Sequence, residues 1–234
     1  MDISLRRVRW GLRDMVFAGL MTLGLVGAGA VVLAAGTLLW PELNALALPP
    51  GILVPAVFAC EVLLLVPAWV WGPRKYGGGW ASLGLRACSV GKSVALLFLG
   101  FSIILLVNAA WDVVRKRLGW AGQPDYLPVF GGGAQGLLIA LLLGGVVAPA
   151  AEEVFFRGYL FAGLRERWGT GAAVVLSSLL FSLAHAVPGV LPPIFIMGAV
   201  FALVYEYSDS LWPCVALHGA VNTLAFAVAY LAER

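Results

Sequence analysis

Three short motifs place ionisable and amide side chains inside apolar stretches of the chain. They are EEVFFR at 152–157, FSLAH at 181–185 and HGAVN at 218–222, and the last two contain both histidines of the sequence. An ionisable side chain in the middle of a membrane helix costs on the order of 2.5 to 3.5 kcal/mol. The two glutamates and the arginine of the first motif therefore need a reason to be there.

Helical spacing separates the two glutamates of the first motif. Glu153 and Arg157 are four residues apart, so they share one face of a helix and can form an ion pair. Glu152 is rotated about a third of a turn from that face. Taken alone, the pair predicts a structural clasp, whereas Glu152 should point towards another group.

The other two motifs offer candidates for that group. His218 and Asn222 are four apart and share a helical face, and His185 has a defined face of its own helix. A single histidine or asparagine in a membrane helix is most often an interhelical hydrogen-bond partner. Two histidines and an unpaired glutamate that converge inside one bundle are harder to explain by packing alone, and they indicate a site.

Composition identifies the elements that must position these residues. The chain has 234 residues, of which 62% are hydrophobic and 12% are charged, and its mean hydropathy is +0.96, which excludes an ordinary soluble domain. Long apolar runs that cross a bilayer must be helices, because each backbone amide needs a partner within its own segment. We therefore expect an all-α, polytopic transmembrane bundle forming one integral-membrane domain over 1–234. Its seven crossings are expected near 15–40, 52–71, 91–111, 135–162, 171–187, 190–206 and 211–231.

The distribution of basic residues predicts the orientation of the bundle. The arginine-rich start, residues 1–14, reads as a retained anchor with a cytosolic N-terminus. This orientation places the loop at 41–50, which lacks Lys and Arg, on the outside. The segment 112–120 conflicts with this orientation, because it carries basic residues and the orientation places it on the outside. Its mix of charged and apolar residues also fits a helix lying on the membrane surface. The basic residues expected in the cytosol are Arg74, Lys75, Arg86, Lys92, Arg165 and Arg167.

The cysteines and the net charge disfavour a disulfide-stabilised or metal-binding protein and a nucleic-acid-binding protein. Cys60, Cys88 and Cys214 match neither a disulfide framework nor a metal-binding spacing, and we assign them no role. The net charge of +3 is modest, and no basic stripe interleaved with aromatic residues suggests nucleic acid as a partner. The expected partner is the lipid bilayer.

The three motifs, in this order and each in an apolar stretch, resemble the CPBP group of intramembrane proteases, also called the Abi or CAAX prenyl endopeptidase type 2 family. EEVFFR corresponds to its EExxxR, FSLAH to its FxxxH and HGAVN to its HxxxN. The resemblance covers roughly residues 80–226, the expected catalytic core. It implies an intramembrane protease that acts on a membrane-associated protein or peptide. The short chain without an organellar extension suggests a bacterial inner-membrane protein whose substrate is not prenylated.

Peptide hydrolysis assigns a role to each residue. It needs a base that activates water and donors that stabilise the oxyanion. Glu152 can act as the base with His185 orienting the water, while His218 and Asn222 can donate to the tetrahedral intermediate. The ion pair beside Glu152 would hold the helix and its charge in place. The resemblance implies the same division.

Three alternatives remain open. Two histidines and a glutamate are also a common ligand set for catalytic zinc, although neither histidine lies in an HExxH motif, and we expect a metal-free site without cofactor. A buried polar cluster could also be the substrate site of a small transporter, but the sequence shows no internal repeat. A non-catalytic bacteriocin-immunity protein is the third alternative, although the complete motifs disfavour it.

Overall fold

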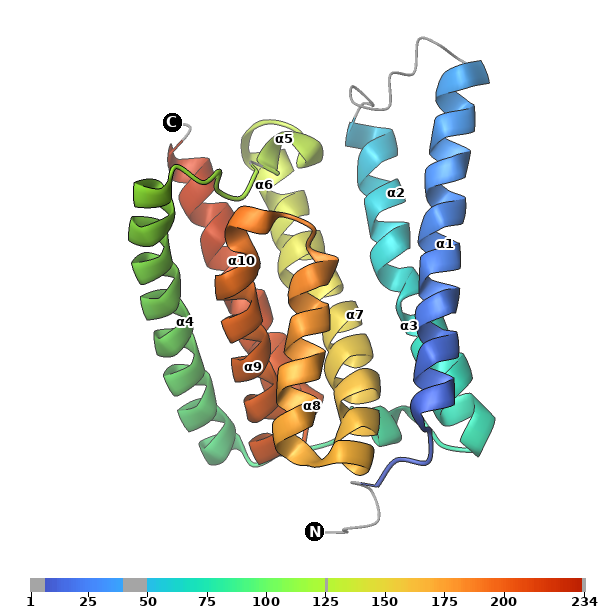
Figure 1. Ribbon diagram of the computed structural model, residues 1–234. Coiled ribbons are helices and arrows are strands. Elements are labelled where there is room, and N and C mark those ends of the chain that lie inside the picture. Colours follow the sequence, from blue (N-terminus) through green and yellow to red (C-terminus); the bar gives the residue numbers. More distant parts are fainter. Residues whose placement is uncertain (1–6, 40–49, 125, 233–234) are drawn as a thin grey trace.

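The computed structural model describes residues 7–39, 50–124 and 126–232, which form helices and connecting turns without strands. Within these residues, six helical segments are long and apolar enough to cross a membrane. They stand side by side as a bundle, with the α1–α2 hairpin beside the remaining helices (Figure 1). The expected all-α, polytopic membrane architecture is confirmed.

The fourth candidate span accounts for two crossings. It covers Gly133–Ala184, and 52 helical residues would extend roughly 78 Å if they were straight, far more than the ~30 Å hydrocarbon layer. Gly169 interrupts it with φ 78° and ψ 170°, a conformation that favours glycine, and the chain turns back there. The six segments thus provide the seven crossings that the apolar runs predict (Figure 1).

The elements follow one another closely along the chain. Three of them, η2, η4 and η5, are π-helical segments that continue neighbouring α-helices. The elements are α1 (Leu12–Leu39), α2 (Pro50–Leu63), α3 (Leu65–Trp69), η2 (Val70–Arg74), η3 (Trp80–Leu83), α4 (Val90–Leu118), α5 (Leu127–Phe130), α6 (Gly133–Leu142), η4 (Leu143–Val147), α7 (Ala148–Glu153), η5 (Val154–Phe161), α8 (Ala162–Ala184), η6 (Pro188–Val190), α9 (Leu191–Ser208) and α10 (Leu211–Ala232).

The charged segment 112–120 is not a separate surface helix, so that expectation is wrong. Its residues up to Leu118 are the last turns of α4, which ends at Gly119 in the left-handed conformation. A helix of 29 residues is roughly 43 Å long, which exceeds the hydrocarbon thickness. The charged turns can therefore lie beyond the apolar layer without leaving the helix.

Most of the predicted cytosolic segments lie at one end of the bundle. The turns around 74–89, 165–170 and 209–210 are at the same end of the bundle as the start of α1 (Figure 1). Arg86 pairs with Asp209 there, and the Ser210 hydroxyl donates to the Arg86 carbonyl at 2.6 Å. Residues 41–49, the greater part of the loop expected outside, fall beyond the described residues. The side of the membrane on which each end lies stays a prediction.

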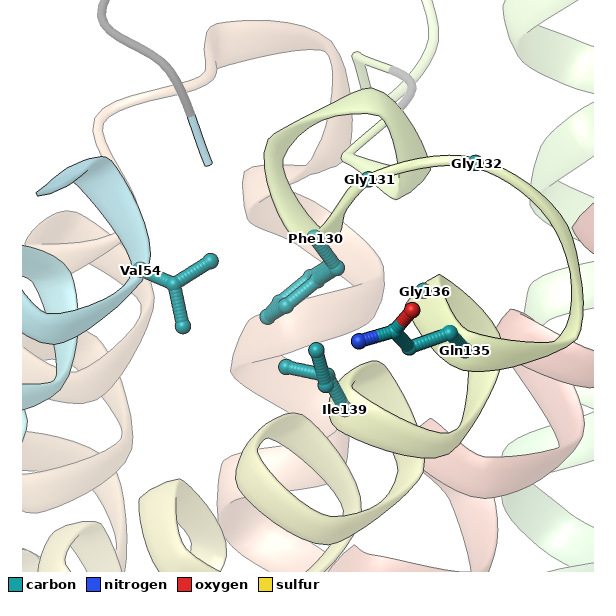
Figure 2. Close-up of a pocket in the computed structure, with 7 residues that line it drawn as sticks. All are labelled: Val54, Phe130, Gly131, Gly132, Gln135, Gly136 and Ile139. Carbon is teal, nitrogen blue, oxygen red and sulfur yellow. The ribbon is translucent and has the colours of Figure 1, made fainter. Parts of the chain in front are cut away.

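Aromatic packing fastens the N-terminal hairpin to the motif-bearing helix. The Trp10 ring stacks on that of Tyr159 at a centroid distance of 5.4 Å, and its indole nitrogen donates to the Tyr159 carbonyl at 2.9 Å. A second hydrophobic cluster lies towards the opposite end, where Val54 of α2 packs with Phe130 and Ala140. The contact between Trp10 and Tyr159 therefore fixes the start of the N-terminal hairpin against η5. The second cluster fixes α2 against α5 and α6, and Figure 2 shows the Val54 side chain directed towards Phe130.

Candidate active site

The first motif lies where α7 passes into the π-helical segment η5. The carboxylate of Glu153 accepts a hydrogen bond from the Arg157 guanidinium, with Oε1 and Nη1 2.9 Å apart, and neither side chain is exposed. The ion pair that the four-residue spacing predicts is therefore present. Because both charges are fully buried, each depends on the other for stabilisation.

Arg157 is also enclosed by aromatic rings from two other helices. Its guanidinium carbon lies 4.2 Å from the ring centroid of Phe181 in α8 and 5.1 Å from that of Phe201 in α9. A second guanidinium nitrogen donates to the carbonyl of Gly198 at 3.2 Å. Cation–π contacts and this hydrogen bond hold the arginine between three helices.

His218 joins this pair, a contact that the sequence did not predict. Its Nδ1 lies 2.9 Å from Oε1 of Glu153, and its ring stacks on Phe201 with centroids 4.8 Å apart. A carboxylate can only accept, so Nδ1 carries the proton. The opposite nitrogen, Nε2, lies 4.0 Å from Oε2 of Glu152. His218 thus lies between the two glutamates.

Close glycine contacts bring α10 to this position. A Cβ atom on Gly219 would lie 2.4 Å from the carbonyl oxygen of Gly145, so a larger residue would push the helices apart. Three residues further along α10, the amide nitrogen of Asn222 donates to the carbonyl of Gly144 at 3.0 Å. His218 and Asn222 therefore share the face predicted for them, but one amide hydrogen of Asn222 is already engaged by backbone.

Of the two motif glutamates, Glu152 is the one that lacks a direct hydrogen-bond partner among the described residues. Its side chain is 15% exposed, and its buried Oε2 makes no hydrogen bond with any described residue. The rotation of Glu152 away from the Glu153–Arg157 face explains this, as the sequence predicts. A buried acceptor without a partner in the protein is available for water or substrate.

His185 follows the last residue of α8. Its Nδ1 lies 2.8 Å from the Phe181 carbonyl, which can only accept, so Nδ1 carries a proton and Nε2 of the neutral ring is an acceptor. The Phe181 ring contacts both histidines, with centroids 4.8 Å from His185 and 5.8 Å from His218. Both histidines therefore contact the same aromatic ring, although His185 contacts neither motif glutamate directly.

The donor arrangement can also be tested for a metal site. Among the described residues, no three histidine, cysteine, aspartate or glutamate side chains are grouped so that they could hold a metal ion. Nδ1 of His218 is engaged by Glu153, and Nε2 lies beside Glu152. These residues do not form a ligand set as they stand, so we derive no chemical step through a metal.

The fold and this cluster define an integral membrane protein with ionisable residues gathered between its helices. Residues 134–224 match the family model for type II CAAX prenyl endopeptidase Rce1-like proteins, and all three motifs lie within that segment. The resemblance to this protease family is confirmed over the matched segment, which is less than half of the chain. The wider core expected at 80–226 stays a prediction.

Two curated relatives are similar to the chain. "Putative membrane peptidase YdiL" of Bacillus subtilis (strain 168) is 28% identical over 147 residues, covering 58% of this chain and 56% of the relative. "UPF0177 protein YxdF" of Lactococcus lactis subsp. lactis (strain IL1403) is 29% identical over 79 residues, covering 33% of this chain and 43% of the relative. The chain thus spans about half the length of the curated relatives it matches. No solved structure matches it.

Proposed function

We propose that the protein is an intramembrane endopeptidase that hydrolyses a peptide bond in a membrane-associated protein or peptide. The observation that carries this proposal is the unpartnered carboxylate oxygen of Glu152, held in a membrane span beside His218. An ionisable group in such a place indicates function. The family match over 134–224 and a relative named as a membrane peptidase support the reaction class.

Glu152 serves as the general base in this proposal. A gap of 4.0 Å separates its Oε2 from Nε2 of His218, which is too long for a direct hydrogen bond but allows one water molecule to bridge the two atoms. Such a water can lose a proton to Glu152 while its oxygen attacks the peptide carbonyl carbon. His185, whose Nε2 is an acceptor, helps to orient this water.

The donors for the oxyanion come from α10. The contact of Nδ1 of His218 with Glu153 holds the ring with Nε2 towards Glu152, and Nε2 can donate to the oxyanion when it carries a hydrogen. Asn222 retains a second amide hydrogen after its bond to Gly144. These two donors would stabilise the developing negative charge of the tetrahedral intermediate.

The remaining steps complete a balanced hydrolysis. The proton that Glu152 takes from water passes to the nitrogen of the leaving amine, the C–N bond breaks, and a carboxylic acid and an amine are released. The buried Glu153–Arg157 pair takes no part in proton transfer. Its role is to fix His218 and the start of η5, so that the reacting groups keep their positions.

The bacterial inner membrane, with a cytosolic N-terminus, is the proposed location. The substrate we expect is a membrane-associated protein or peptide that is not prenylated. Apart from His185, which follows the span that ends at Ala184, the site residues lie within the candidate spans, and most of the residues on either side of the motifs are apolar. A substrate would therefore present its cleaved bond from a hydrophobic segment.

The test compares membrane proteomes of cells that express the wild-type protein, Glu152→Gln or Glu166→Gln. Glu166 is exposed in α8, away from the motif residues, and provides the matched control. We expect terminal peptides of cleaved membrane proteins with wild type and Glu166→Gln, and their loss with Glu152→Gln at equal protein levels. The same cleavage products with Glu152→Gln would remove Glu152 from the role of base.

A further inference from the structure

The turn between α8 and α9 follows His185 directly and makes contacts that have no role in the site described above. It covers residues 186–190, and Ala186 adopts the left-handed conformation with φ 54°. A residue other than glycine rarely takes this conformation, because its Cβ crowds the neighbouring carbonyl oxygen. Surrounding contacts must therefore hold the chain in this shape.

A tightened helix end precedes the turn and carries His185. The His185 amide donates to the Ser182 carbonyl, three residues earlier, at 3.1 Å. The next amide, that of Ala186, repeats this pattern with the Leu183 carbonyl at 3.1 Å. Such bonds are those of a 3₁₀ turn, which often ends an α-helix. The Phe181 carbonyl, four residues before His185, accepts from Nδ1 of the ring at 2.8 Å, so the shape of the helix end determines where the ring lies.

The hydroxyl of Ser182 ties this helix end to the start of α9. It donates to the Leu191 carbonyl at 2.7 Å, and the residue is buried. The bond spans the whole turn, since Ser182 precedes the turn and Leu191 follows it. Ser182 therefore contacts both the backbone of His185 and the far end of the turn.

Helix α4 supplies a second contact with the turn. The indole nitrogen of Trp111 donates to the Gly189 carbonyl at 2.8 Å. A Cβ atom on Gly189 would lie 2.0 Å from the Ala121 carbonyl oxygen, so the segment after α4 packs directly on the turn. Gly189 is buried, and a buried carbonyl that loses its donor costs free energy. Trp111 thus holds the turn against α4.

We propose that Trp111 and Ser182 are positioning residues that act through His185. By holding the α8–α9 turn, they keep Nδ1 of the His185 ring bonded to the Phe181 carbonyl, which leaves Nε2 able to accept a hydrogen bond from water. A loosened turn would let the ring exchange its tautomer or rotate away from the site. The catalytic part of this inference rests on the proposed function, in which His185 orients the attacking water.

The tautomer of His185 is measured by ¹⁵N NMR of the whole chain, labelled at histidine, in detergent micelles without substrate. The chain has two histidines, so the spectrum of His218→Gln identifies the His185 signals. At alkaline pH, where the ring is neutral, wild type should show one tautomer with the proton on Nδ1. Trp111→Phe, which retains an aromatic ring but removes the donor, and Ser182→Ala should each show a mixture of both tautomers.

Matched controls separate this effect from the loss of any polar group nearby. Trp120→Phe removes the indole donor of an exposed tryptophan that packs edge-on against Trp111. Ser177→Ala removes a buried hydroxyl whose bond, at 3.5 Å, stays within its own helix. Both variants should retain the wild-type histidine signals. Ser182→Thr keeps the hydroxyl and should retain them as well.

Kinetics give the second readout, with a synthetic peptide that spans a cleavage site found in the proteome comparison as the probe. Trp111→Phe and Ser182→Ala should each lower kcat by roughly 10- to 10²-fold, because a slightly misplaced group acts mainly on the transition state. KM should change little. Mixed tautomers with an unchanged kcat would overturn the positioning role.

Unchanged His185 signals in a folded Trp111→Phe or Ser182→Ala protein, with the His218 signals intact, would overturn the inference for that residue. Either variant tests the turn, so failure of one to fold leaves the test intact. A Ser182→Thr spectrum that matches Ser182→Ala would also overturn it. Tautomer mixing without any cleavage by wild type would retain the role of the turn and overturn the protease. Glu152-dependent cleavage with unchanged His185 signals would overturn only the role of the turn.

Discussion

Replacing Arg157 by alanine should destabilise the protein by about 3 to 5 kcal/mol, the usual cost of leaving one partner of a buried ion pair uncompensated. Glu153 would remain fully buried with only His218 as a partner, and the contacts with Phe181 and Phe201 would be lost. For a chain of this size, about 2 to 4 °C of Tm per kcal/mol converts the loss into roughly 6 to 20 °C.

A thermal scan of the detergent-solubilised protein measures this change. Arg167→Ala, which removes an exposed arginine of the same helical stretch, is the matched control and should leave the Tm almost unchanged. Glu153→Gln combined with Arg157→Gln removes both charges, so its loss should be smaller than the sum of the two single losses. A stable, well-expressed Arg157→Ala protein that is merely slow would contradict the clasp and indicate that Arg157 contacts substrate.

Three further outcomes are expected. Activity should survive exhaustive chelation, and tightly bound zinc whose removal and return switch activity off and on would overturn the metal-free mechanism. His218→Ala or Asn222→Ala should each lower kcat by ~10²- to 10³-fold with substrate binding largely retained, which single-turnover kinetics would measure. Reporters fused at the N-terminus and within 41–49 should report cytosol and outside respectively, and the opposite pattern would invert the orientation.

The close glycine contact gives a last expectation. Gly219→Ala should lower stability by about 1 to 3 kcal/mol, because the new Cβ would lie 2.4 Å from the Gly145 carbonyl oxygen. Gly27→Ala, where a Cβ meets nothing within 4 Å, is the control in the same thermal scan. Equal melting temperatures for the two variants would show that α10 can move without cost.

Local and compositional properties of this protein were predictable from its sequence. Hydropathy defines the crossings because the bilayer sets the length of an apolar helix and demands internal hydrogen bonding. Helical periodicity defines the Glu153–Arg157 pair and the separation of Glu152, since four residues make about one turn. The order of the three motifs was sufficient for the family resemblance that the match over 134–224 confirms.

Contacts between distant segments required the tertiary structure. Glu153 and His218 are 65 positions apart, and their 2.9 Å contact depends on the angle and depth at which α10 meets η4. That approach is decided by glycines 145 and 219, whose lack of side chains has no periodic signal in the sequence. Periodicity assigns a residue to a face of its own helix, but only packing determines which face of another helix it meets.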